Sequence, residues 1–157
     1  MSAADGLRPG ESEAERYDRN WTDVLQELRV LQTGSQILTG FLLALAFQPA
    51  FANLDDAQRV LYLVLVVLSA VSAVVALAPV ALHRVLFREG RKGLIVRVGH
   101  IALVTAMAVV SALLVGVLAF VFDVVAGEQA AWTAGGALGV LVVLLWAAVP
   151  LALRSRR

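Results

Sequence analysis

Four long stretches of the sequence contain no Asp, Glu, Lys or Arg. They extend over residues 30–54, 60–82, 98–122 and 129–153. Because a helix rises 1.5 Å per residue, roughly 20 apolar residues are enough to cross a hydrocarbon core ~30 Å thick. The pattern therefore predicts transmembrane helices over about 32–52, 58–82, 98–122 and 130–153. The expected fold is all-α, an integral membrane bundle of four transmembrane helices.

A different pattern precedes the first span. Residues 1–19 combine small, charged and turn-forming residues, which predicts a disordered tail ahead of a four-helix membrane domain over residues 20–157. Asn20 can cap a helix, and apolar residues then recur at helical spacing: Trp21, Val24, Leu25, Leu28 and Leu31. This amphipathic stretch could be an interfacial or partner-binding helix, or a cytoplasmic extension of the first span that packs on the inner loop between the second and third spans.

The basic residues are sorted by segment. Twelve of the thirteen precede the first span, follow the fourth, or lie between the second and third, whereas Arg59 alone lies on the other side. By the positive-inside bias, both termini and the amphipathic stretch are expected in the cytoplasm of a multi-pass plasma-membrane protein. The basic residues near the second loop are Arg84, Arg88, Arg91, Lys92 and Arg97. They could hold anionic lipid headgroups as well as set the topology.

Composition supports the membrane class and narrows the chemistry. Hydrophobic residues make up 60% of the chain and the mean hydropathy is +0.82, whereas soluble domains contain roughly 45–50% apolar residues. The chain has no Cys, which excludes disulfides, thiolate metal sites and Cys nucleophiles. It also lacks a phosphate loop, a zinc-ligand pattern and a recognisable nucleic-acid module. We expect no enzymatic activity, no cofactor, no metal and no nucleic-acid partner.

Polar residues within the spans are few and patterned. Gln32, Ser35, Gln36 and Thr39 follow i, i+3, i+4, i+7 spacing and form one stripe. An unpaired amide in hydrocarbon costs several kcal/mol, so this stripe is expected to face the bundle. It could line a polar vestibule for an ion or small solute, or form hydrogen bonds between helices. His100, near the start of the third span, could add a proton relay or simply lie at headgroup level.

Small and aromatic residues mark helix contacts and span ends. The small residues predicted at helix contacts are Ala108, Ala112, Gly116, Ala131, Gly135 and Gly139. The last two form a GxxxG pair, which permits packing of the third and fourth spans or homo-oligomerisation. The aromatic residues expected to form a belt at the outer surface are Phe47, Phe51, Tyr62, Phe120, Phe122 and Trp132.

Several segments together resemble a known family. They are LQELRVLQTGSQILTGFLL onward from Leu25 to Phe51, LDDAQR from Leu54 to Arg59, Ala78-Pro79, and HRVLFR from His83 to Arg88. The chain looks like the small actinobacterial four-span membrane proteins catalogued as a domain of unknown function. The resemblance covers roughly residues 21–122 and implies the membrane architecture. Some members carry an automatic sodium:proton antiporter label.

Two functional hypotheses follow. The first is a non-enzymatic membrane protein acting through helix packing, oligomerisation, or interaction with a partner or with lipid. The alternative is a small cation or proton transporter or channel that uses the stripe of the first span with His100. All twelve acidic residues lie outside the uncharged runs, whereas coupled cation and proton exchange generally uses a carboxylate within the membrane. We therefore prefer the first hypothesis.

Overall fold

The computed structural model of the chain describes residues 10–86 and 92–155. Its long helices are α1 (Glu13–Leu45), α2 (Asp56–Leu86), α3 (Lys92–Ala126) and α4 (Glu128–Val143). A 3₁₀ turn, η1 (Pro49–Asn53), joins α1 to α2, and α4 continues through η3 (Leu144–Ala148) into α5 (Val149–Arg154). Four helical stretches are long and apolar enough to cross a membrane. The predicted all-α bundle with four spans is confirmed.

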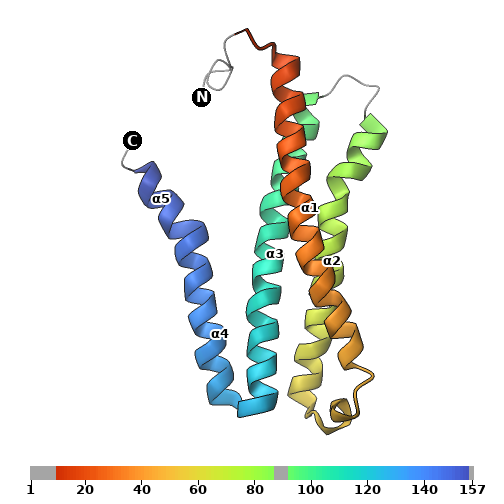
Figure 1. Cartoon of the computed structure of the whole chain (residues 1–157), viewed down its shortest axis with the longest axis vertical. Coiled ribbons are helices and arrows are strands. Elements are labelled where there is room, and N and C mark those ends of the chain that lie inside the picture. The colour runs from red at the N-terminus through yellow and green to blue at the C-terminus, as the bar shows by residue number, and fades with distance from the viewer. Residues whose placement is uncertain (1–9, 87–91, 156–157) are drawn as a thin grey trace.

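Helices α1, α2 and α3 pack on one another in pairs, whereas α4 packs on α3. Figure 1 shows the first three side by side, with α4 and α5 leading away from them toward the C-terminus. Within α4, η3 and α5, Gly135 is the buried residue. Within the bundle, α4 thus joins the other three helices through α3.

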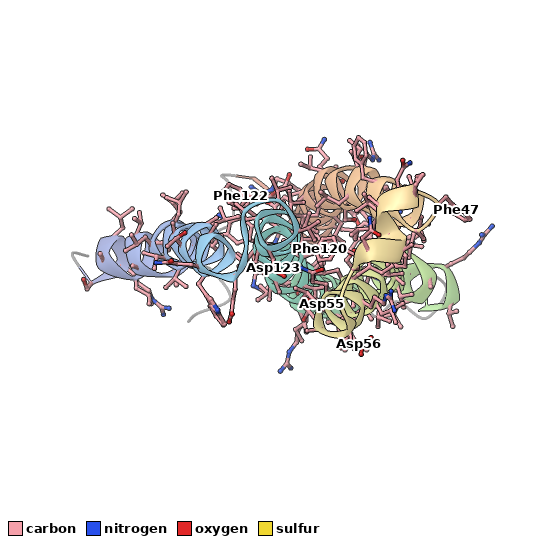
Figure 2. All side chains as sticks on the ribbon, turned by 90° about the horizontal axis from the view of Figure 1, so that it is seen from below. Phe47, Asp55, Asp56, Phe120, Phe122 and Asp123 are labelled. Atoms are coloured by element: carbon pink, nitrogen blue, oxygen red, sulfur yellow. The ribbon has the colours of Figure 1, made fainter. Side chains whose placement is uncertain are left out.

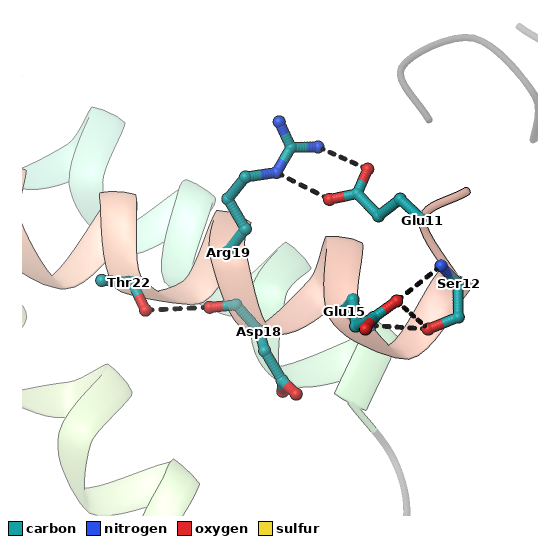
Figure 3. Close-up of polar contacts among 6 residues, drawn as sticks. All are labelled: Glu11, Ser12, Glu15, Asp18, Arg19 and Thr22. Atoms are coloured by element: carbon teal, nitrogen blue, oxygen red, sulfur yellow. Dashed lines mark hydrogen bonds and ion pairs between the residues drawn. The ribbon is translucent and has the colours of Figure 1, made fainter. Parts of the chain in front are cut away.

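Helix α1 begins two turns before the predicted cap at Asn20. Glu15 N donates a 3.3 Å hydrogen bond to Ser12 Oγ, and the Glu15 carboxylate accepts one of 2.8 Å from Ser12 N (Figure 3). This capping box satisfies backbone donors that a helix start leaves unpaired. Arg19 Nε also lies 3.0 Å from Glu11 Oε1. Residues 13–19 are therefore helical, and residues 1–9 of the predicted tail lie outside the described residues.

The amphipathic stretch and the first span form one continuous helix. Trp21 stacks on His83 near the end of α2, with ring centroids 5.0 Å apart. Val24 and Leu28 are buried against Leu103 and Ala106 of α3 in one apolar cluster. Of the two predicted alternatives, this packing agrees with an extension of the first span. We call this end of the bundle the His83 end.

The opposite end, the Asp55 end, holds an aromatic cluster. Tyr62 packs against Phe51 and Phe120, at centroid distances of 4.9 and 6.1 Å. Its hydroxyl donates a 2.8 Å hydrogen bond to Leu42 O, one of the last four α1 carbonyls, which lack partners within the helix. Figure 2 shows Phe120 between the helices and Phe47 at the edge of the molecule.

The predicted aromatic belt is accordingly only half right. Phe51 is half-buried and Tyr62 and Phe120 are buried, whereas Phe47, Phe122 and Trp132 are exposed. The three inner rings fill the core where α1 ends and its terminal carbonyls need a donor.

The small residues predicted at helix contacts lie in different environments. Gly135 of α4 lies against Ala119 of α3, where an added Cβ would come within 3.1 Å of the alanine Cβ. Gly116 faces Leu65 of α2, and Gly139 has open space around it. Ala108 and Ala112 are exposed, and Ala131 is half-buried. Close approach of α3 and α4 therefore depends on Gly135.

The π-helical turn η3 is explained by Pro150. Proline has no N–H and its ring clashes with the carbonyl four residues earlier, that of Trp146. Val149 N–H instead bonds Leu144 O, five residues back, and this wider turn accommodates the proline inside a continuous helix.

Replacing Gly135 with leucine should loosen α4 from α3, because the new side chain must displace Ala119. Overpacking of this kind costs roughly 1–3 kcal/mol. Gly136→Leu is the matched control, since open space surrounds that position, and its effect should stay within about 0.5 kcal/mol. The free energy of unfolding can be measured by titrating detergent-solubilised protein with SDS. Equal losses for both variants would contradict the packing of α4 on α3.

Candidate functional site

The predicted polar stripe of the first span does not face the bundle as a unit. Ser35 is buried, with 2% of its surface exposed. Gln32 and Thr39 are half-buried and Gln36 is exposed. The inward line of α1 contains Val24, Leu28, Ser35 and Leu42, and Gln36 is turned about 100° away from Ser35. The expectation that all four residues face neighbouring helices is wrong for Gln36.

The hydroxyls in the core bond to their own helices. Ser35 Oγ donates to Gln32 O at 3.1 Å, and Thr39 Oγ1 donates to Ser35 O at 2.7 Å. Ser69, Ser72 and Ser111 likewise donate to carbonyls three or four residues back. These bonds satisfy the hydroxyls without a partner on another helix. The stripe therefore does not form the predicted hydrogen bonds between helices through Ser35 and Thr39.

Two contacts define how α1 lies against α2. Trp21 stacks on His83 at one end, and Leu42 O accepts from Tyr62 at the other. Twenty-one residues separate the two contact points on each helix, a length of about 32 Å. This length matches a hydrocarbon core of ~30 Å. Residues 21–42 of α1 therefore occupy the same depth as the apolar residues 62–83 of α2.

Contacts with α3 give the same register. Trp21 and Val24 lie against Gly99, and Tyr17 lies against Gly93. Gly99 is the second residue of the uncharged run of α3. Both neighbouring helices are thus apolar at the depth where α1 still carries charged and amide side chains.

These side chains gather on the side of α1 that points away from the bundle. We define the outward polar face as Thr22, Gln26, Arg29, Thr33, Gln36 and Gly40, all of which are exposed. The spacing alternates between four and three residues, which keeps the set on one side of the helix. Asp23 and Glu27, also exposed, flank it toward the His83 end.

The two amides on this face differ from its hydroxyls. Thr22 and Thr33 donate to backbone oxygens of Asp18 and Arg29, both at 2.9 Å. Within residues 10–86 and 92–155, the side chains of Gln26 and Gln36 make no hydrogen bond. An unpaired amide at hydrocarbon depth costs several kcal/mol. The sequence pattern indicated a polar face over Thr22, Gln26 and Arg29, but Gln36 was grouped with Ser35 instead. The alternating spacing from Thr22 was the available signal that the face continues to Gln36.

His100 does not join this set. It is exposed on α3 and follows Gly99, which lies at the level of Trp21. Gln36 is fifteen residues beyond Trp21 along α1, or about 22 Å. The candidate relay of His100 with the stripe therefore has no direct contact within one chain.

The basic residues near the second loop are only partly described. Arg84 and Arg97 are exposed at the His83 end, on α2 and α3. Lys92 begins α3, and Arg88 and Arg91 lie outside the described residues. Because Arg84 and Arg97 are exposed, the rest of the described chain does not block the predicted contact of these two side chains with anionic headgroups.

The Asp55 end carries a second polar group. Asp55 Oδ1 accepts a 2.8 Å bond from Gln58 N, so Asp55 caps α2. Gln58 Nε2 donates to Asp123 Oδ2 at 3.0 Å and ties α2 to α3. Asp55, Asp56 and Asp123 all lie at this end in Figure 2. Arg59 lies 3.8 Å from Asp56 and donates to Ala52 O.

A hollow of about 520 Å³ lies beside these residues, between α2 and α4. It is lined by Asp55, Ala57, Leu61, Ala119, Asp123, Glu128, Ala131 and Trp132. Among the described residues, no three His, Cys, Asp or Glu side chains are arranged to hold a metal ion. Capping and the Gln58 bond account for Asp55 and Asp123, so the outward polar face is the stronger candidate site.

The comparison with protein families agrees with this architecture. A family model described as a family of unknown function (DUF6328) matches residues 10–150. The chain belongs to this family. The match extends from the capped start of α1 to Pro150 and confirms the resemblance to a domain of unknown function. No curated protein and no solved structure matches the chain.

The depth of α1 can be measured directly. Because Trp21 is level with His83, Thr33 should be level with Val71 of α2, and both residues are exposed. Spin labels on Thr33→Cys and Val71→Cys in lipid vesicles should report the same immersion depth, within one helical turn, from oxygen and nickel accessibility. A label at Thr33 that is nearer to water than one at Val71 by two turns would overturn this register.

Proposed function

We propose that this DUF6328 protein is a non-enzymatic integral membrane protein that acts by assembling with other membrane helices. The supporting observation is the outward polar face of α1, which lies beside apolar segments of α2 and α3. An interhelical hydrogen bond in a membrane contributes about 0.6 kcal/mol on average, so a helix that covers Gln36 and bonds its amide stabilises the assembly. Assembly provides that cover.

Assembly is favoured over a transport pathway through a single chain. Ser35 points into the core while Gln36 points outward, so the four residues of the stripe do not meet around one space. The hollows between α2 and α4 and along α2 are lined by other residues. Transport of a cation or proton stays a prediction from the sequence.

A photo-crosslinking amino acid placed at Gln36 should capture a protein partner in native membranes. The matched control is Val67, which is 61% exposed on α2 and lies within one turn of the same depth. The Val67 variant should form lipid adducts only. Denaturing gels with mass spectrometry of the adduct separate protein from lipid capture. Lipid adducts alone at both positions would refute assembly through this face.

The proposal includes an orientation. The basic residues of the His83 end and of the C-terminus are expected at the cytoplasmic surface of the plasma membrane, in line with the positive-inside bias. Exposed Arg84 and Arg97 would then lie among anionic headgroups, each at about 1 kcal/mol.

The chain has no Cys, so single cysteines report topology cleanly. Asp56→Cys and Glu128→Cys should react with an impermeant thiol reagent on intact cells. Ser155→Cys should react only after the cells are permeabilised. Labelling of Ser155→Cys on intact cells, with protected Asp56→Cys, would reverse the orientation.

A further inference from the structure

We infer that the helix covering the outward polar face of α1 is α1 of a second copy of the same chain. The two copies have the same orientation in the membrane and are related by a two-fold axis along the membrane normal. This inference rests on the proposed function and names its partner.

The carboxamide of Gln36 favours an identical partner. It carries both donors and an acceptor, so one Gln36 side chain can bond another in both directions. In a two-fold dimer the same patch is used by both copies. Two copies with one orientation place Gln36 opposite Gln36 at one depth, and Thr33 lies one turn away on the same face.

Gly40 allows the two backbones to approach. It lies one turn beyond Gln36 on the same face, and an added Cβ there would meet no atom within 4 Å. Small residues at such positions permit close helix contact in membranes. The steps of three and four residues from Thr33 through Gln36 to Gly40 match the spacing at the contact of a left-handed helix pair.

Arg29 is compatible with this pairing. It is eleven residues from Gly40 along α1, about 16 Å toward the His83 end. Helices that cross near Gln36 and Gly40 at about 20° diverge toward Arg29, which sets the two guanidinium groups apart. The long side chain can also extend toward the membrane surface.

Helix α4 offers a weaker surface. It too has open glycines, Gly136 and Gly139, but its exposed side chains within the span are almost all apolar, and hydrocarbon accommodates them. The hydrogen-bonding capacity that a partner must satisfy is on α1. The dimer contact is therefore placed on α1.

Cysteine crosslinking tests the contact, because two thiols oxidise to a disulfide only when their Cα atoms lie within about 7 Å. Under copper-phenanthroline oxidation in native membranes, Gly40→Cys and Gln36→Cys should form covalent dimers in most chains. Gly34→Cys, also in open space but about 120° around α1 from Gly40, should form less than about a tenth as much. So should Gly136→Cys on α4.

The dimer affinity in lipid vesicles provides a second measurement. Gln36→Leu should weaken dimerisation by about three- to twentyfold, the range from losing one average interhelical hydrogen bond to losing one strong one. Gly40→Leu should weaken it at least as much, because its side chain blocks the close approach. Gly34→Leu should leave the affinity unchanged. Single-molecule photobleaching across protein-to-lipid ratios reports the dimer fraction, and preserved helicity verifies folding.

The outcomes separate this inference from the proposed function. A photo-crosslink from Gln36 to a different protein, with no disulfide at Gly40→Cys, overturns the second copy and leaves assembly standing. A disulfide that forms at Gly136→Cys but not at Gly40→Cys moves the contact to α4 and overturns the inference. Absence of every protein crosslink refutes both.

Discussion

The alignment of α1 with α2 and α3 is the constraint on which the rest of the structure depends. It is held at the His83 end by Trp21 between His83 and Gly99, and at the Asp55 end by the bond from Tyr62 to Leu42 O. The second contact is favoured because the end of α1 leaves carbonyls without partners. With both ends held, the depth of each α1 residue follows.

This alignment separates the two roles of polar groups in the bundle. Buried serines are satisfied by carbonyls of their own helices, so the core can be closely packed without a hydrogen-bond network between helices. Bonds such as Gln58 to Asp123 occur instead near the helix ends. Among the described residues at the depth of 21–42, the side-chain amides of Gln26, Gln32 and Gln36 make no hydrogen bond, and those of Gln26 and Gln36 lie on the outside of α1.

Much of the fold could be predicted from hydrophobic run length. The number of helices and the approximate bounds of α2, α3 and α4 follow because an apolar run of this length satisfies its backbone hydrogen bonds in lipid only as a helix. The first span was predicted over 32–52, whereas α1 extends over Glu13–Leu45. Helix ends were less predictable, since they depend on local bonds such as the capping boxes at Ser12 and Asp55. Nothing in the span lengths indicates that α4 packs mainly on α3.

The candidate site was harder to predict than the fold. The i, i+3, i+4, i+7 pattern correctly grouped polar residues along α1, but a spacing of one residue between Ser35 and Gln36 turns their side chains by about 100°. Which of them faces the core depends on the register with α2 and α3, a property of packing between distant segments. The uncharged run that begins at Val30 also underestimates the length of α1. A helix that is apolar on one side only can continue beyond its uncharged run.

Helices α1 and α4 show why exposure has different meanings in a membrane. The exposed side chains at the C-terminal end of the chain include Val140, Leu144 and Leu151. Lipid tails are as apolar as these side chains, so contact with another helix adds no hydrophobic stabilisation. Lipid tails offer no hydrogen-bond partner to the amide of Gln36 on α1. Where hydrophobic burial cannot distinguish protein from lipid, an unpaired amide is the stronger indication of an interface. The least apolar helix of this bundle therefore marks the surface that a partner helix should cover.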